Sequence, residues 1–137
     1  MAGVHGLPAR RGEPLVQVGL RSPVLFPGDD SYAARIESYW CNNANLRPSC
    51  IVQSHSVEEV FKAVAALAKA HQHFAVRAGG HTNWAGSNNI TNGVTIDLGF
   101  LDVTSYDDAT QVAHIGPGAK WKDVYAELEQ HGWRSRS

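Results

Sequence analysis

The stretch FAVRAGGHTNWAGSNNITNGVTIDL, residues 74–98, decides how this chain is expected to fold. A short apolar run, 74–76, stops at Arg77, and two glycines, a histidine and a long polar loop precede a second apolar run at 93–98. Apolar, β-branched runs bounded by glycine-rich and polar segments are typical of strands. The stretch therefore predicts two strands, with a loop that begins where the first one ends.

The loop begins with Gly79 and Gly80, which can adopt positive φ because they carry no Cβ. Successive backbone N–H groups in such a turn can converge on an anion, and a pyrophosphate fits that geometry. Ala78, Ala85 and Gly86 keep the neighbouring side chains small, so a ligand can approach the backbone. Because the loop leads to a strand and not to a helix, the sequence argues against a helix-dipole phosphate site.

The segment before this stretch predicts a strand and then a helix. Ile51 and Val52 suit a buried strand. Ser56 and Glu59 have the spacing of a capping box, and apolar residues follow at one helical face: Val57, Val60, Phe61, Val64, Leu67 and Ala68. The order strand, helix, strand predicts a right-handed crossover that pairs 51–52 with 74–76 in parallel.

The remaining elements follow from the same signals. A helix is expected in YAARIESYW, residues 32–40, after the capping residues 29–31. Strands are expected at 103–106 and 111–116 around a turn at 107–108. A last helix opens at Trp121 and ends near Gly132, which suits a left-handed C-terminal cap. The fold class is α+β.

Residues 1–28 are dense in glycine and proline, which disfavours regular elements. We expect a loosely ordered N-terminal arm over 1–28 and a folded domain over 29–137.

The composition and net charge argue against nucleic acid and membranes as partners. The chain has 137 residues, of which 43% are hydrophobic and 18% charged, and a formal net charge of −1, as in a single globular domain without a basic surface. We expect no nucleic-acid partner and no membrane, since no apolar run approaches the ~20 residues of a spanning helix. No secretory signal is visible, so the compartment stays open, and no protein partner can be inferred.

The sequence contains no motif that indicates a metal site or a hydrolase. The histidines lack the paired spacing of a zinc site, and no G-x-S-x-G occurs. Cys41 and Cys50 lack CxxC spacing; two reduced thiols are favoured, and a Cys41–Cys50 bridge is the alternative. Asn89-Ile90-Thr91 forms a glycosylation sequon. For His81 itself two interpretations stay open: an imidazole bonded to a loop carbonyl, or a ligand-binding group.

Three separated segments, PSCIVQSHSVEEV, FAVRAGGHTNWAGSNNITNGVTIDL and AHIGPGAKWKDVYAELEQHGW, carry a resemblance. Together they resemble the N-terminal part of the FAD-binding domain of the berberine bridge enzyme-like oxidoreductases, in the vanillyl-alcohol oxidase (PCMH-type) superfamily. The resemblance runs from about Leu46 to Trp133, and the three segments agree in order and spacing. It implies the N-terminal α/β subdomain of a PCMH-type FAD-binding domain.

In that family an R-x-G-G-H loop wraps the FAD pyrophosphate, and its histidine is joined covalently to the 8α-methyl of the flavin. Carried over, the resemblance implies that His81 forms the link and that these residues bind the cofactor: Arg77, Ala78, Gly79, Gly80, His81, Thr82, Ala85 and Gly86. The segment 116–118 with Trp121 matches a family segment near the cofactor, although a turn and a packing helix explain it equally well.

The resemblance implies an FAD-dependent oxidoreductase that moves hydride from a small organic substrate to the flavin and returns the electrons to oxygen. The chain departs from the family after Trp133, where RSRS stands in place of a glycine-rich continuation that completes the cofactor site. We therefore expect an incomplete, truncated domain without the catalytic residues of a whole enzyme. The alternatives are a non-catalytic remnant and a structural domain that does not bind FAD productively.

Overall fold

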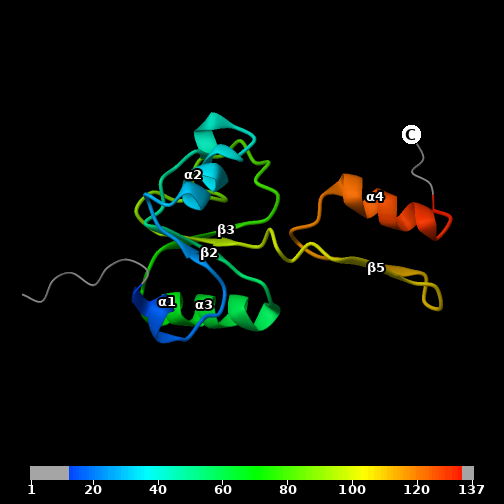
Figure 1. The fold of residues 1–137 in the computed structure, drawn as a ribbon, viewed down its shortest axis with the longest axis horizontal. Coiled ribbons are helices and arrows are strands. Elements are labelled where there is room, and N and C mark those ends of the chain that lie inside the picture. The colour runs from blue at the N-terminus through cyan, green and yellow to red at the C-terminus, as the bar shows by residue number, and fades with distance from the viewer. Residues whose placement is uncertain (1–12, 134–137) are drawn as a thin grey trace, which may run out of the picture.

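The computed structural model describes residues 13–133, which form two sheets with helices around them (Figure 1). The elements in chain order are α1 (Glu13–Gln17), β1 (Val24–Leu25), α2 (Asp30–Glu37), the 3-10 turn η1 (Asn42–Ala44), β2 (Cys50–Gln53), α3 (Val57–Lys69), β3 (Phe74–Arg77), β4 (Val94–Asp97), β5 (Thr104–Asp107), β6 (Val112–Ile115) and α4 (Trp121–Gln130). None of the helices in this range is long and apolar enough to cross a membrane.

The larger sheet has the strand order β1-β2-β4-β3. β2 and β3 both run parallel to β4, and β1 pairs antiparallel with β2 at the edge. The predicted crossover through α3 is present, but the prediction that its two strands pair with each other is wrong. β4 lies between them, because its fully buried run can be covered on both sides only in the middle of the sheet.

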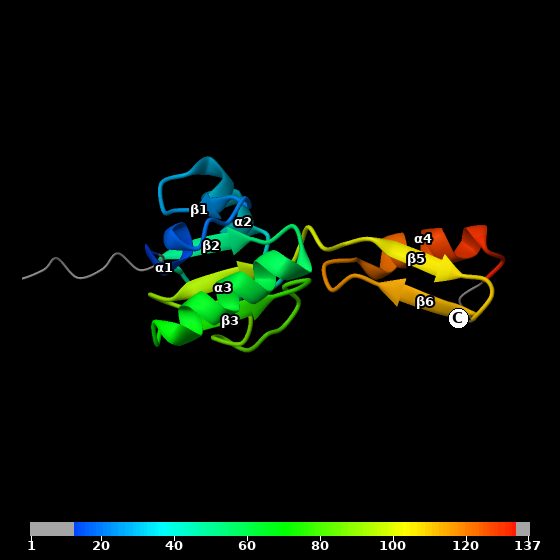
Figure 2. The same cartoon turned by 90° about the horizontal axis from the view of Figure 1, so that it is seen from below.

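Helices cover both faces of this sheet, with α1 and α3 on one face and α2 on the other (Figures 1 and 2). Alternate residues of a strand point to opposite faces, so the sheet serves two cores. The core under α1 and α3 contains Leu15, Cys50, Val52, Ala63, Leu67, Val94 and Ile96. The core under α2 contains Leu25, Tyr32, Ile36, Tyr39, Ala44 and Ile51.

The helix α3 begins where the capping box predicts, because the Ser56 side chain accepts from the Glu59 N–H at 3.3 Å. Its predicted apolar face is only partly correct. Ala63 and Leu67 are buried, whereas the side chains of Val57 and Phe61 are 73% and 72% exposed. The buried face is centred on Ala63 and Leu67, with Val60 and Val64 partly buried beside them, and Val57 and Phe61 lie outside it.

The prediction of a loosely ordered arm over 1–28 is wrong for residues 13–28; residues 1–12 lie outside the described part. This segment contains α1 and β1, and the Leu15 side chain is fully buried. Pro14 falls in the first turn of α1, where no backbone donor is needed, and Pro23 precedes an edge strand. Burial against α3 and pairing with β2 therefore outweigh the local breaker signals.

The second sheet is the predicted hairpin, in which β5 pairs antiparallel with β6. α4 packs on it, and Gly132 ends this helix with φ of +82°, as the sequence predicted. In both views the hairpin and α4 stand apart from the larger sheet, joined to it by the segment between β4 and β5 (Figures 1 and 2).

Candidate functional site

The three parallel strands of the larger sheet end side by side. Arg77 at the end of β3 and Gln53 at the end of β2 are both register partners of Asp97 at the end of β4. All three residues line a cavity of about 450 Å³ at this carboxyl edge. In open sheets with parallel strands, ligands bind at this edge, because loops diverge there and leave a crevice.

Asp97 is the buried anion of the site and is fully paired. Its two carboxylate oxygens accept from Arg35 Nη2 and Nε, each at 2.6 Å, in a bidentate ion pair. Gln53 Nε2 and the Gly99 N–H donate to the same carboxylate at 3.3 and 3.0 Å. Since a buried carboxylate is stable only when its charge is compensated, this pairing fixes Arg35 at the cavity wall.

Arg77 is buried under the loop that it begins, with only 1% of the residue exposed. Its Nη1 donates to the Arg35 carbonyl at 2.8 Å, and its Nη2 donates to the Ser38 carbonyl and hydroxyl at 3.2 and 3.0 Å. The guanidinium carbon lies 3.8 Å from the centre of the Tyr39 ring. Desolvation, followed by the charge of Arg35, lowers the pKa of Arg77. Desolvation raises the pKa of Tyr39, and the nearby Arg77 charge opposes that shift.

One donor of Arg77 is left over. Its Nε is buried and has no hydrogen-bond partner within residues 13–133. Buried donors are normally satisfied, so this nitrogen is an exception. It is enclosed beside the Gly80 backbone, and a ligand in the cavity does not reach it.

Of the two adjacent glycines that were expected to adopt positive φ at the start of the loop, only Gly80 does so. Gly80 has φ of +77° and Gly86 has φ of +82°, whereas Gly79 lies outside the positive-φ region. A Cβ at Gly80 would lie 2.9 Å from the Arg77 guanidinium, so this position has no room for a side chain. The Gly80 carbonyl accepts from the Trp40 N–H at 3.2 Å, which joins the loop to the segment after α2.

His81 is exposed at the cavity wall. Its ring is stacked on that of Trp40, with centroids 5.4 Å apart and planes at 11°. Within residues 13–133 neither ring nitrogen has a hydrogen-bond partner, so the interpretation of His81 as an imidazole bonded to a loop carbonyl is not supported. Both nitrogens are free for a ligand.

The structure brings together half of the predicted site. Arg77, Ala78, Gly79 and His81 line the cavity, whereas Gly80, Thr82, Ala85 and Gly86 do not. Sequence reasoning missed Arg35, Gln53, Asp97, Lys120 and Asp123, which are among the other residues of the wall. Asp97 could have been found as a charged residue that ends a β-branched strand, and Lys120 because it follows the Gly-Pro-Gly turn. Arg35 carried no signal, since it lies on an ordinary surface position of a helix.

The sequon does not describe a modification site in the folded chain. Asn89 is fully buried, and its Nδ2 donates to the carbonyls of Ala44 and Leu46 at 2.9 and 2.8 Å. Its Oδ1 accepts from Thr95 Oγ1 at 2.9 Å. The cysteines are free, as favoured from the sequence, and burial raises the pKa of the Cys50 thiol to about 11.

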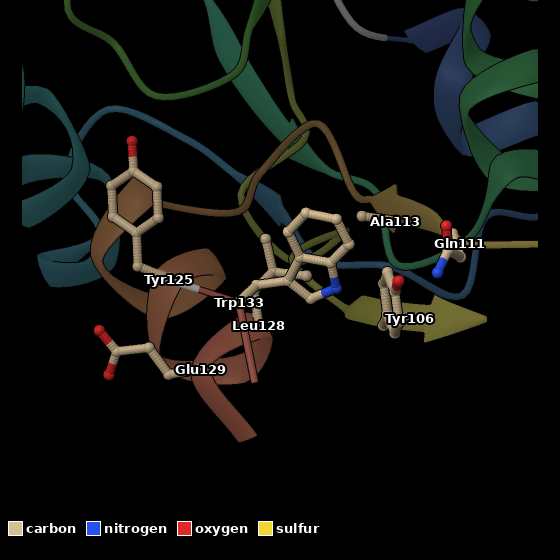
Figure 3. A pocket seen from close by; sticks show the side chains of 7 residues that line it. All are labelled: Tyr106, Gln111, Ala113, Tyr125, Leu128, Glu129 and Trp133. Atoms are coloured by element: carbon tan, nitrogen blue, oxygen red, sulfur yellow. The ribbon is translucent and has the colours of Figure 1, made fainter. Parts of the chain in front are cut away.

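A second cavity, of about 280 Å³, lies between the hairpin and α4 (Figure 3). Its lining is largely apolar and includes Tyr106, Ala113, Leu128 and Trp133. It contains none of the predicted site residues. The cavity at the carboxyl edge is therefore the better candidate for polar chemistry, because the buried Asp97 carboxylate, its partner Arg35 and the buried Arg77 line it.

Comparison with known proteins shows the family to which the chain belongs. A family model described as an FAD binding domain matches residues 48–136. The FAD-dependent monooxygenase sdcF of Emericella nidulans is 42% identical over 107 residues, which are 77% of this chain and 22% of that protein. This chain thus spans about a fifth of that relative's length.

Solved structures share the fold. The crystal structure of 6-hydroxy-D-nicotine oxidase from Arthrobacter nicotinovorans matches with a TM-score of 0.74 and 28% identity, over 84% of this chain and 25% of that one. BBE-like 1 of Physcomitrella patens matches with a TM-score of 0.74 and 21% identity, over 87% and 25% of the two chains. The α+β prediction and the resemblance are confirmed, and the chain matches part of a longer domain. The chain therefore belongs to the FAD binding domain family, with the fold of the berberine bridge enzyme-like flavoproteins.

Proposed function

We propose that this chain is the first part of an FAD-dependent oxidoreductase and that its loop at 77–86 binds the FAD diphosphate. The match of residues 48–136 to the FAD binding domain carries the proposal. The binding residues are those that the resemblance implied: Arg77, Ala78, Gly79, Gly80, His81, Thr82, Ala85 and Gly86.

The residues of the cavity fit such a ligand. Arg35 lies at the cavity wall with 25% of its side chain exposed, so its guanidinium can meet an anionic oxygen. Gly80 has positive φ, and its backbone lies so close to the Arg77 guanidinium that a residue with a Cβ would not fit there. A volume of about 450 Å³ lies within the range of small-molecule sites, which is about 300–1,000 Å³. Lys120 adds a further positive charge to the wall.

We further propose that His81 is the point of covalent attachment. Its ring lies at the cavity wall and neither nitrogen is engaged within residues 13–133. The bond would join an imidazole nitrogen to the 8α-methyl carbon, with loss of one methyl hydrogen and one imidazole proton, while two electrons pass to the flavin and then to dioxygen. The role of the chain in this step is to present the imidazole nitrogen of His81 as the nucleophile.

The proposed reaction of the whole protein is oxidation of a small organic substrate. The relatives are named as FAD-dependent monooxygenases and oxidases. Bound FAD supplies the hydride acceptor, and the protein supplies orientation and electrostatics. The catalytic base and the substrate site are not proposed for residues 13–133, because this chain covers only about a quarter of the solved structures.

A chain that does not bind FAD productively is the second candidate. The cavity wall supports it in one respect: the cations Arg35, Arg77 and Lys120 are balanced by the anions Asp97, Asp102 and Asp123. A wall without net charge attracts a diphosphate only through local donors.

Incubation of the purified chain with FAD tests these candidates. We expect protein-bound yellow absorbance, and a mass increase of one FAD that survives denaturation. His81→Ala should abolish the mass increase, because the attacking nitrogen is gone, whereas His114→Ala should keep it, since His114 is an exposed residue of β6 away from the cavity. A retained increase in His81→Ala would remove His81 from the link. No bound FAD at all would favour the second candidate.

A further inference from the structure

Trp40 is a large aromatic residue in an unusual place. It follows α2 and is 74% exposed, yet its indole lies parallel to the imidazole of His81 at a centroid distance of 5.4 Å. An exposed tryptophan has no burial to gain from this position, so the stack is the main contact that orients its ring.

The backbone holds the two rings in register. The Trp40 N–H donates to the Gly80 carbonyl at 3.2 Å, one residue before His81. Arg77 also binds this segment, because its guanidinium donates to the carbonyls of Arg35 and Ser38. These contacts fix the backbone of Trp40 relative to that of His81, and the stack orients the two exposed rings.

Tyr39 fixes the other end of the loop. Its hydroxyl donates to the Asn88 carbonyl at 2.9 Å, and its ring carries the Arg77 guanidinium on one face. The segment 38–40 thus contacts the His81 loop at Arg77, Gly80 and Asn88. Tyr39 contacts the loop at buried atoms, while Trp40 contacts His81, an exposed side chain that lines the cavity.

We propose that Trp40 is a positioning residue, which holds the His81 imidazole in one orientation at the cavity wall by stacking on its face. The inference rests on the proposed attachment of FAD through His81. A nucleophile gains rate when its reacting atom is held near the attack geometry, and an exposed imidazole without a hydrogen bond would otherwise rotate freely. A single aromatic stack accounts for about a fivefold gain.

Three variants separate stacking from simple exposure. Trp40→Leu removes the aromatic face, and Trp40→Phe keeps one. Trp84→Leu is the matched control, because Trp84 belongs to the same loop, is 79% exposed and stacks on no ring within residues 13–133. Both positions are on the surface, so the chain should fold in each of the three variants.

The first readout needs no cofactor. In the unloaded chain, ring current from the indole should shift the His81 ring protons upfield in NMR spectra. Trp40→Leu should abolish that shift, Trp40→Phe should keep part of it, and Trp84→Leu should leave it unchanged. Unchanged His81 protons in Trp40→Leu would overturn the proposal.

The second readout is the rate at which FAD becomes covalently attached, followed by mass. Trp40→Leu should slow it about fivefold, with non-covalent FAD affinity unchanged, and Trp40→Phe should restore the rate to within about twofold. An unchanged rate in Trp40→Leu, or a Phe variant as slow as the Leu variant, would overturn the positioning role. Absence of attachment in the unaltered chain would instead refute the proposed link through His81, and the ring protons would then decide the role of Trp40.

Discussion

Glu59 is the residue that joins the N-terminal segment to α3. Its carboxylate accepts from the N–H groups of Arg21 and Ser22 at 2.9 and 3.0 Å, from the His55 N–H at 3.2 Å, and from the Ser22 hydroxyl. These hydrogen bonds, with that of the Ser22 side chain first, lower the pKa of Glu59 to about 2. The capping-box glutamate thus turns outward to a second segment instead of closing back on Ser56.

Replacement of Glu59 by glutamine tests this junction. Glu59→Gln keeps the shape but removes the charge and one acceptor oxygen, so we expect a loss of roughly 1 to 2 kcal/mol in the free energy of unfolding. Urea unfolding at pH 7 measures it. Glu58→Gln is the control, since Glu58 is exposed in the same turn, and it should change stability by less than about 0.5 kcal/mol.

The same junction gives stability a pH dependence. The folded pKa of Glu59 is about 2 and the ordinary value is 4.5, so the stabilisation is fully present above pH 4.5 and is lost as the pH falls toward 2. Between these limits the unaltered chain should lose stability more steeply than Glu59→Gln. Parallel curves for the two proteins would contradict the assignment of this carboxylate.

Individual residues were the least predictable part of the site. Asn89 begins a glycosylation sequon, but its side-chain amide donates hydrogen bonds to carbonyls that are more than forty positions away along the chain. Arg77 was expected to bind a ligand, and most of its donors instead hold the end of α2. Both roles depend on contacts between segments, which local spacing does not encode.

Elements were more predictable than residues, because the period of apolar residues is a local property. The period predicted α3, α4 and the hairpin strands close to their observed bounds. The sheet order was not available from it, since the placement of β4 between β2 and β3 depends on which strand can be buried on both faces. For the same reason α1 and β1 were missed: tertiary contacts stabilise them against their glycine- and proline-rich surroundings.

The Gly-Pro-Gly turn before α4 is an element whose glycines are required for contact, not for conformation. A Cβ at Gly116 would lie 2.1 Å from the Leu101 carbonyl oxygen, and one at Gly118 would lie 2.2 Å from that of Leu98. The Gly116 and Gly118 N–H groups donate to Val103 and Leu101 at 2.9 and 3.0 Å. This close backbone pairing connects the hairpin and α4 to the end of β4.

Gly116→Ala should therefore destabilise the unit formed by the hairpin and α4 by roughly 2 kcal/mol or more, because backbone atoms cannot move aside as a flexible side chain can. Denaturant unfolding followed by far-UV circular dichroism measures the loss. Ala119→Gly, in the same turn, adds no atom, and we expect it to cost less than about 1 kcal/mol. Equal losses in the two variants would show that the close approach at Gly116 is relieved elsewhere.

At the scale of the molecule, burial is divided unequally. The larger sheet has cores on both faces, whereas Val124 is the only buried residue in 101–133. Val103, Val112, Ile115 and Trp121 remain exposed on the hairpin and α4. A two-stranded hairpin with one helix gains little from burial, so its stability depends on the turn that attaches it.

The two parts should therefore open at different free energies. Amide hydrogen exchange should be at least about tenfold slower in β2 and β4 than in β5 and β6, because the central strands exchange only when the larger sheet opens. Mass or NMR detection at neutral pH resolves the two groups. Gly116→Ala should speed exchange in β5 and β6 while leaving β2 and β4 nearly unchanged, since it loosens only the attachment. Equal protection of all four strands would mean that the chain opens as one cooperative unit and that the few contacts at the turn couple the two sheets.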